Sequence, residues 1–169
     1  MICRSVLICS LVAAALQLQK EPTEIVGLVN EVLRSMQSEA GRGSISMNVV
    51  APTANIVVDV DPVRIREVLT NLLSNAIRHT PAGNAVTTAV SKANGKASVT
   101  VADTGEGMPP QEVARIFDRF YKGASSRGSG LGLSIAKGIV AAHGGDIDAS
   151  SEAGRGTTVT FTLPTSEAD

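Results

Sequence analysis

Hydrophobic and polar positions along this chain follow two periods, which predict helices and strands in a mixed order. Residues 22–40 place apolar side chains on one helical face, and residues 62–79 do the same after Asp61-Pro62, a pair typical of a helix start. Shorter helical patterns cover 109–121 and 130–143. The segments that alternate or run β-branched, and so favour strands, are 44–50, 55–60, 85–91, 96–102, 146–151 and 157–163.

The order of these segments predicts one α+β domain. We expect 44–50 and 55–60 to form a strand pair, and 85–91 and 96–102 to form a hairpin around Lys-Ala-Asn-Gly. The helix over 130–143 is apolar on almost every side, which predicts that it is buried. No internal repeat or long linker divides the chain. The expected architecture is a two-layer sandwich, a mixed sheet with helices on one face.

Composition excludes several classes of protein. The 169 residues are 43% hydrophobic and 18% charged, as in an ordinary globular protein, and the formal net charge of −1 gives no basic surface for nucleic acid. Cys3 and Cys9 are the only cysteines, and no ligand cluster accompanies them. Free thiols in a reducing compartment are therefore favoured over a zinc site, with redox regulation as an alternative.

The apolar run near the N-terminus has two interpretations. It is about a dozen residues long, follows Arg4, and lacks a clear small-residue cleavage site, so a packing helix is favoured over a signal peptide. It is too short to span a bilayer as a helix.

The second helix carries a polar stripe beside its apolar face. Asn71 and Asn75 lie one helical turn apart, and Arg78 continues the stripe. Amide oxygens are suitable ligands for Mg²⁺, and an arginine can bind phosphate oxygens. An ordinary solvated flank with incidental amides is the alternative.

Three clusters of glycines in the sequence predict that the backbone there closely approaches a ligand or another segment of the chain. Asp103, Gly105 and Gly107 follow directly after a strand, although a strand-to-helix turn needs at most one glycine. Gly128, Gly130 and Gly132 precede a helix, where backbone N–H groups and the helix dipole favour an anion; close packing would also explain them. The spacing matches neither a Walker A loop nor a Rossmann fingerprint. Gly154-Arg155-Gly156 predicts a hairpin turn before the last strand.

Five motifs in this order resemble the ATP-binding domain of sensor histidine kinases, whose superfamily includes gyrase, Hsp90 and MutL. The Glu67–Thr80 segment ExxxNLLSNAIRHT resembles the N box, and DTGEGM resembles the G1 box. IFDRFYKG resembles the F box, GSGLGLSIAKGIVAAHGG the G2 box, and GRGTTVTFTLP the G3 element. The resemblance extends from residue 16 to residue 164. It implies a Bergerat-type sandwich, with boundaries at 1–18 for a helical remnant, 19–165 for the ATP-binding catalytic domain and 166–169 for a tail.

The resemblance also implies roles for individual residues. Asp103 would accept a hydrogen bond from the adenine amino group, with Gly105 and Gly107 letting the backbone approach the base and sugar. Asn71 and Asn75 would hold Mg²⁺ and, with Arg78, act on the phosphates as catalytic residues, and His79 is a further candidate for phosphate contact.

The remaining implied contacts lie along the G2 and G3 motifs. The residues expected to bind the phosphate end or to anchor and form a mobile lid are Gly128, Gly130, Leu131, Gly132, Leu133, Lys122 and Arg127. Phe117 and Phe120 would fasten the base of the lid or belong to the core. Thr157 would contact the nucleotide through a water.

Two departures from the family shape the functional hypothesis. The loop YKGASSR is shorter than usual, and neither His79 nor His143 has the sequence context of a phosphoacceptor. The sequence therefore predicts the catalytic part of a split kinase, which transfers the ATP γ-phosphate in trans to a histidine on a partner's dimerising hairpin and so acts indirectly on a response regulator.

Three rival functions remain open at this point. They are a serine kinase of the anti-sigma type, a nucleotide-sensing module without turnover, and an ATPase machine like gyrase. Dependence on ATP favours a cytoplasmic location, with recruitment to a membrane through a partner as an addition.

Overall fold

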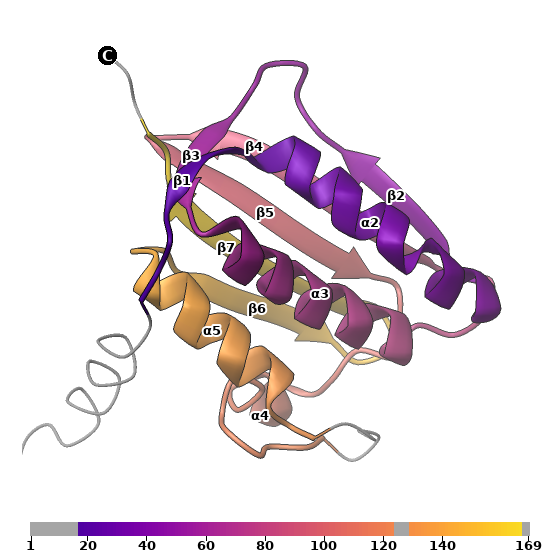
Figure 1. The fold of residues 1–169 in the computed structure, drawn as a ribbon. Coiled ribbons are helices and arrows are strands. Elements are labelled where there is room, and N and C mark those ends of the chain that lie inside the picture. The colour runs from indigo at the N-terminus through magenta and orange to yellow at the C-terminus, as the bar shows by residue number, and fades with distance from the viewer. Residues whose placement is uncertain (1–16, 124–128, 167–169) are drawn as a thin grey trace, which may run out of the picture.

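The computed structural model describes residues 17–123 and 129–166. In chain order, their elements are β1 (Glu21–Glu24), α2 (Ile25–Arg42), β2 (Ser46–Val50), β3 (Val57–Val60), α3 (Pro62–His79), β4 (Ala85–Ala93), β5 (Lys96–Asp103), α4 (Pro110–Val113), α5 (Gly132–Ala142), β6 (Ile147–Glu152) and β7 (Gly156–Pro164) (Figure 1). The expected N-terminal helix, Cys3, Cys9, Arg127 and Gly128 lie outside the described residues.

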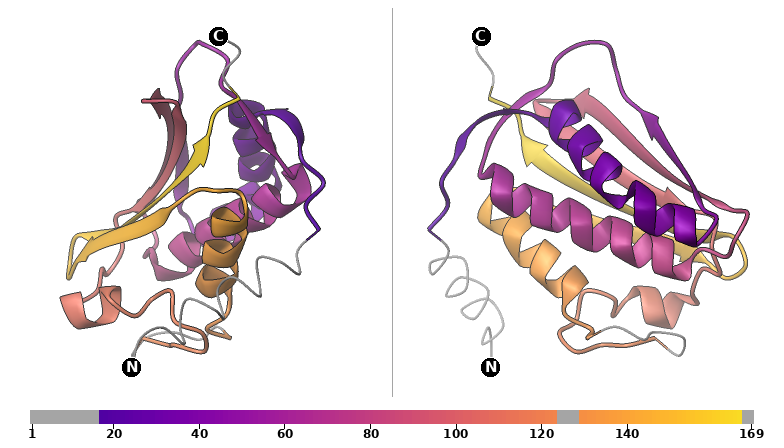
Figure 2. Two further views of the ribbon diagram at one scale, coloured as in Figure 1. Left: turned by 90° about the vertical axis from the view of Figure 1, so that its left-hand side faces the viewer. Right: turned by 45° about the vertical axis from the view of Figure 1, so that its right-hand side comes forward.

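A five-stranded mixed sheet forms one layer, in the order β2-β4-β5-β7-β6. β2 runs parallel to β4, and the other neighbouring pairs are antiparallel. Helices α2, α3 and α5 cover one face of this sheet (Figure 2). The predicted α+β sandwich, with a mixed sheet and helices on one face, is confirmed.

The helix α3 forms where the sequence predicts it because both its start and its apolar face are encoded locally. The Asp61 side chain accepts hydrogen bonds from the backbone N–H groups of Val63 and Arg64, and Pro62 occupies the first turn. Its buried residues are Ile65, Val68, Leu69, Leu72, Leu73, Ala76 and Ile77. Burying this face against the sheet and α2 leaves the predicted polar stripe on a flank.

The predicted pairing of 44–50 with 55–60 is wrong. β2 pairs with β4, whereas β3 pairs antiparallel with β1 in a separate two-stranded sheet. Residues 21–24, expected mostly within a helix, form β1, and α2 begins at Ile25 because the Glu24 carboxylate caps it. A parallel pair needs a long crossover, which α3 supplies between β2 and β4.

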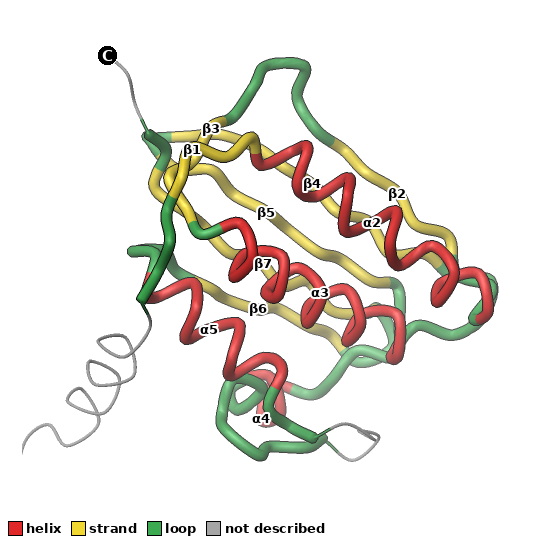
Figure 3. The backbone as a smooth tube through the Cα atoms, in the orientation of Figure 1, coloured by secondary structure: helices red, strands yellow, loops and turns green. Residues whose placement is uncertain are grey.

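The predicted length of one helix and the predicted burial of another were both too large. Of residues 109–121, only Pro110–Val113 form a helix, and Figure 3 shows α4 as a short turn within a stretch of loop. Helix α5 is buried at Ala136, Ile139 and Val140, but Ile135 is 40% exposed, so the expectation of burial on all sides is wrong. The α3 helix and the sheet cover only one side of α5 within the described part of the chain.

No helix among the described residues has the length and apolar character needed to cross a bilayer.

Candidate functional site

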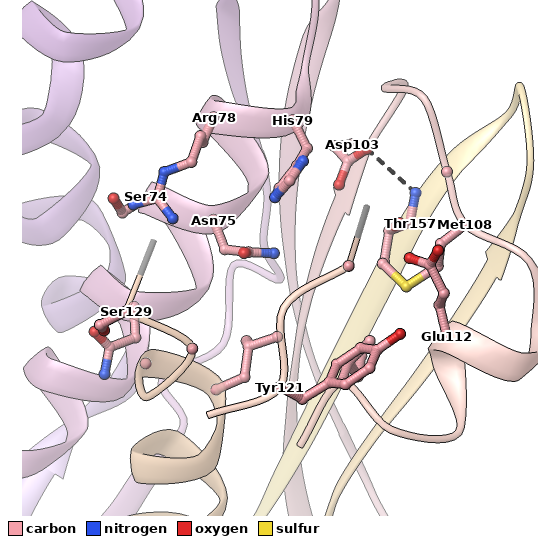
Figure 4. A pocket seen from close by; sticks show the side chains of 17 residues that line it. Ser74, Asn75, Arg78, His79, Asp103, Met108, Glu112, Tyr121, Ser129 and Thr157 are labelled. Atoms are coloured by element: carbon pink, nitrogen blue, oxygen red, sulfur yellow. Dashed lines mark hydrogen bonds between the residues drawn. The ribbon is translucent and has the colours of Figure 1, made fainter. Parts of the chain in front are cut away.

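A cavity of about 220 Å³ opens between the second half of α3, the end of β5, the α4 region and the N-terminus of α5. Figure 4 shows Asn75 and His79 from α3 facing the space that Asp103 and Thr157 border from the other side. The residues that line it are Asn71, Ser74, Asn75, Arg78, His79, Asp103, Gly107, Met108, Glu112, Ile116, Tyr121, Gly123, Ser129, Gly130, Gly132, Leu133 and Thr157.

The polar stripe of α3 forms one wall of this cavity. Asn71, Asn75 and Arg78 all line it, as does Ser74, which lies on the same flank. The apolar face of the helix is buried against the core, so these side chains have only the cavity or solvent to face. The structure therefore brings the three predicted catalytic residues together on one surface.

Asp103 lies at the end of β5 and is held by two backbone N–H groups. Gly105 donates to Oδ1 at 2.9 Å, and Thr157 donates to the same oxygen at 3.2 Å. Burial raises the pKa of Asp103 above its ordinary range, although these two amides and the nearby His79 favour the charged form. Both recorded bonds use Oδ1, so the carboxylate is fixed in orientation through one of its two oxygens.

The side chains of Ser151 and Thr157 form a hydroxyl cluster beside Asp103. The Ser151 Oγ lies 2.8 Å from the Thr157 hydroxyl, contacts the Gly156 carbonyl oxygen at 2.9 Å, and accepts the Met108 N–H at 2.9 Å. The cluster joins the β6–β7 hairpin to the loop that follows Asp103. Ser151 was not predicted from sequence, because its partners come from two segments that lie apart in the chain, the loop at Met108 and the start of β7.

Contacts within the protein explain the closely spaced glycines after Asp103. A Cβ at position 105 would overlap the His79 carbonyl oxygen and would lie 2.8 Å from Asp103 Oδ1. A Cβ at position 107 would overlap the Glu152 carbonyl oxygen. Gly107 lines the cavity, whereas Gly105 acts through its N–H. Their predicted approach to the base and sugar stays a prediction.

The Gly-rich segment before α5 forms the opposite end of the cavity. Gly130, Gly132 and Leu133 line it, and a Cβ on Gly132 would lie 3.5 Å from Asn71 Oδ1. Leu131 is the residue before the helix and does not line the cavity. The N-terminus of α5 therefore lies beside the amides of α3, where it would favour an anion.

The loop between F box and G2 box is closed at its base by backbone atoms. The Phe120 N–H donates to the Gly130 carbonyl oxygen at 3.0 Å. Gly130 has a φ of +72°, and a Cβ there would lie 2.7 Å from the Tyr121 carbonyl oxygen. The Phe120 side chain is 71% exposed, so a core role for it is wrong, whereas Phe117 packs against the core. Lys122 is exposed and lies outside the cavity lining.

Several lining residues were not predicted from sequence. Met108, Ile116 and Tyr121 give one wall an apolar part, and Glu112 adds a carboxylate near Gly123. The Arg115 guanidinium lies 4.6 Å from the centre of the Tyr121 ring. The roles of Glu112, Ile116 and Tyr121 were obscured because we expected one continuous helix over residues 109–121. His79 lines the cavity near Asp103 (Figure 4), and its contact with phosphates stays a prediction.

A protein family with known members matches most of this chain, including the segments that form the cavity. Residues 60–167 match the family described as histidine kinase-, DNA gyrase B- and HSP90-like ATPase. This chain belongs to that family. The matched range includes every residue that lines the cavity.

Individual relatives narrow the family to the histidine kinase branch. The sensor histidine kinase WalK of Bacillus subtilis is 44% identical over 123 residues, which cover 69% of this chain and 20% of WalK. The adaptive-response sensory kinase SasA of a Synechococcus strain is 36% identical over 156 residues, which cover 90% of this chain and 41% of SasA. The chain thus spans about a fifth to two fifths of these two relatives.

Solved structures agree with the sequence relatives. The mycobacterial sensor histidine kinase MprB superposes with a TM-score of 0.77 at 28% identity, over 86% of this chain and 97% of that one. Full-length ShkA, in complex with AMPPNP, superposes with a TM-score of 0.81 at 32% identity, over 97% of this chain and 36% of ShkA. The chain therefore contains an ATP-binding catalytic domain of the histidine kinase type.

The donor set suits a nucleotide-bound Mg²⁺ better than an all-protein metal site. The described residues hold no cluster of three or more His, Cys, Asp or Glu side chains able to bind a metal. Mg²⁺ commonly uses one or two protein oxygens, with phosphate and water oxygens completing the shell. Asn71 and Asn75 supply neutral amide oxygens of that kind on the cavity wall.

Proposed function

We propose that this domain binds ATP with Mg²⁺ and transfers the γ-phosphate in trans to a histidine on a partner protein. The observation that carries this proposal is that a buried carboxylate and two amides border one cavity from opposite sides. One wall suits a purine amine and the other suits a metal-bound triphosphate. Because the two walls lie on opposite sides of the cavity, a bound nucleotide would place its base beside Asp103 and its phosphates beside Asn71 and Asn75.

Asp103 is the proposed adenine ligand. Its Oδ1 is held by Gly105 and Thr157, and its second oxygen is the group we assign to the adenine amino group. Guanine offers a carbonyl at that position, and an oxygen facing a buried carboxylate would be repelled. Thr157, buried beside Asp103, is positioned to contact the base directly or through water.

The amides of α3 and the glycines of α5 are the proposed phosphate end. Asn71 and Asn75 would hold the Mg²⁺, whose role when bound is to neutralise charge on the transferring phosphoryl group. Arg78, from the same wall, would bind phosphate oxygens, as would backbone N–H groups near Gly130 and Gly132. We propose three further phosphate contacts in the loop before α5. They are Lys122, Arg127 and Gly128, of which the structure describes only Lys122.

Neither histidine of the sequence suits the role of phosphoacceptor. His143 is 3% exposed and uses both ring nitrogens in hydrogen bonds. His79 lies near Asp103, at the proposed adenine end of the cavity (Figure 4). We therefore propose an acceptor outside these 169 residues, on a partner's helical hairpin. Sensor kinases among the relatives support a response regulator as the later recipient.

Calorimetric titration of the whole chain with ATP and Mg²⁺ tests the nucleotide site. We expect saturable binding that Asn75→Ala weakens at least tenfold in the presence of Mg²⁺, because an amide ligand is lost. The matched control is Thr70→Ala, an exposed change on the same helix outside the cavity lining. Equal affinity for Mg²⁺–ATP in both variants would count against the proposed site.

A labelling experiment tests the transfer. The chain is incubated with γ-labelled ATP, alone and with a purified hairpin protein from a sensor kinase. We expect label only on the hairpin, stable in alkali and lost in acid, as phosphohistidine is. Acid-stable label would instead favour the serine kinase, and label on this chain alone would contradict transfer in trans.

The non-catalytic alternative makes a different prediction. A nucleotide-sensing module would bind ATP with the wild-type affinity and would never label any hairpin. Asn75→Ala would then leave its signalling output unchanged wherever nucleotide still binds.

A further inference from the structure

A polar cluster with two buried members lies where α3 begins and α5 ends, remote from the cavity. It consists of His143, Asp61 and the backbone of Gln19, and none of the three lines the cavity. His143 and Asp61 are 3% and 6% exposed. The proposed function uses neither of them, so their burial needs a separate reason.

The hydrogen bonds fix His143 in one tautomer. Its Nδ1 lies 2.8 Å from the Ile139 carbonyl oxygen, so Nδ1 carries the hydrogen. Nε2 then accepts the Asp61 backbone N–H at 3.0 Å. This bond joins the C-terminal end of α5 to the residue that starts α3, across 82 positions of sequence.

Asp61 extends the same cluster to a third segment. One carboxylate oxygen accepts the Val63 and Arg64 N–H groups that begin α3, and the other accepts the Gln19 N–H at 3.0 Å. Residues 17–20 are therefore attached to the start of α3 and, through Asp61, to the end of α5. We refer to this His143–Asp61–Gln19 cluster as the joint.

The joint acts on the same two helices that border the cavity. Figures 1 and 2 show α3 and α5 side by side, running in opposite directions. At the other end of α5, Gly132 approaches Asn71, which lies in the middle of α3, and both residues line the cavity. Helices are stiff on this length scale, so a shift at the joint changes the spacing of the phosphate end.

We propose that His143 is a positioning residue for the nucleotide site. By accepting the Asp61 N–H, it holds α5 at the spacing from α3 that binds nucleotide, and it makes that spacing depend on residues 17–20. The inference rests on the proposed nucleotide site. Coupling is reciprocal, so bound nucleotide must also tighten the joint by the same factor.

Two conservative substitutions separate this role from simple packing. In His143→Gln, the side-chain oxygen reaches the position of Nε2 and still accepts the Asp61 N–H. In His143→Asn, the amide nitrogen takes the place of Nδ1 and donates to Ile139, but nothing reaches Asp61. We expect His143→Gln to bind Mg²⁺–ATP within about twofold of wild type and His143→Asn about fivefold more weakly.

Residue-resolved hydrogen exchange by NMR gives the reciprocal readout. Saturating Mg²⁺–AMPPNP should slow exchange of the Gln19 amide about fivefold in wild type and His143→Gln, and leave it unchanged in His143→Asn. A residue with only a packing role would lower stability in both variants without this difference. Should His143→Asn fail to fold, the wild-type comparison with and without nucleotide decides the question alone.

Two outcomes would overturn the inference, and they differ in whether the proposed function also fails. If the wild type binds nucleotide but Gln19 exchange is indifferent to it, the joint is not coupled to the site and the proposed function stands. If the folded wild type binds no nucleotide, the proposed function fails and the inference fails with it.

Discussion

The backbone N–H of Thr157 donates to Oδ1 of Asp103 across 3.2 Å, and so joins the first residues of β7 to the last residue of β5. The Gly105 N–H reaches the same oxygen at 2.9 Å. Two neighbouring backbone segments thus orient one carboxylate that burial alone would disfavour. The orientation of Asp103 is therefore a property of the sheet and its following loop, not of its side chain alone.

Replacing that carboxylate should separate stability from binding. Asp103→Asn keeps an oxygen for the Gly105 and Thr157 N–H groups but turns an NH₂ group toward the proposed adenine amine. We expect nucleotide affinity to fall on the order of tenfold to a hundredfold, because a hydrogen bond to a charged group is lost. Burial raises the pKa of Asp103, so the ionised form costs folding free energy as pH rises, and the neutral Asn should unfold at a higher temperature at pH 7.

Calorimetric titration and thermal unfolding measure the two effects of Asp103→Asn. Unchanged affinity would show that Asp103 has no contact with the base. A lower unfolding temperature would show that the carboxylate stabilises the fold, contrary to the direction of its pKa.

Gly154, in the turn before β7, and Gly156, the first residue of β7, provide a matched pair of backbone tests. Gly156 has a φ of +105°, and a Cβ there would overlap the Asp103 carbonyl oxygen, whereas Gly154 has a φ of +82° with nothing within 4 Å of its Cβ position. Gly154→Ala should cost about 1–2 kcal/mol of unfolding free energy from backbone strain alone. Gly156→Ala should cost clearly more and should also weaken nucleotide binding. Denaturant unfolding that gave both variants equal stability would contradict the overlap.

The buried hydroxyl of Thr88 offers a route to higher stability. Thr88 is fully buried, and its Oγ1 has no hydrogen-bond partner among the described residues. Thr88→Val keeps the side-chain shape and removes the unpaired oxygen, so we expect about 1–2 kcal/mol more unfolding free energy.

The control for Thr88→Val is Thr87→Val, on the half-exposed face of the same strand, with an expected change within about 0.5 kcal/mol. Urea unfolding measures both. Destabilisation by Thr88→Val would show that the hydroxyl has a partner that the described residues do not reveal.

The burial of His143 predicts a pH-dependent stability. Burial lowers the pKa of His143 below its ordinary value of about 6.5, against opposing effects of the Ile139 hydrogen bond and Asp61, with Lys20 adding to the lowering. The unfolded chain then binds the proton more tightly, so this contribution is complete above pH 6.5 and is lost as pH falls below it.

Unfolding free energies measured between pH 8 and pH 5 check this direction. His143→Gln should flatten the profile in this range, because the amide does not titrate. Burial opposes ionisation of Asp61, but amide bonds from Gln19, Arg64 and Val63 lower its pKa on balance, so its own contribution is lost only at pH values below the ordinary aspartate range. A wild-type profile that does not fall below pH 6.5 would contradict a lowered His143 pKa.

The parts of the fold that sequence predicts well are those with local causes. The apolar stripe of α3 and its Asp61 cap depend on contacts within four residues, and both are where the pattern placed them. The β4–β5 hairpin follows from the turn Asn94-Gly95. By contrast, the parallel pairing of β2 with β4 links segments separated by a whole helix, and strand period alone carries no information on partner choice.

The same division applies to the candidate site. The spacing of Asn71, Asn75 and Arg78 on one flank is fixed by helical geometry, and the resemblance supplied Asp103 and the glycines. The Ser151 cluster and the apolar wall of Met108, Ile116 and Tyr121 depend on how loops pack, so no local pattern indicated them.

The amino-acid order by itself determined which stretches become helices and strands, which faces of them are apolar, and which polar groups share a helix flank. Backbone sterics and hydrogen bonds between near neighbours set these periods before any long-range contact forms. Only the tertiary structure decided that β1 joins β3, that Thr157 holds Asp103, and that His143 meets Asp61. Those choices depend on the packing of the whole chain, where each buried polar group must find a partner among segments distant in sequence.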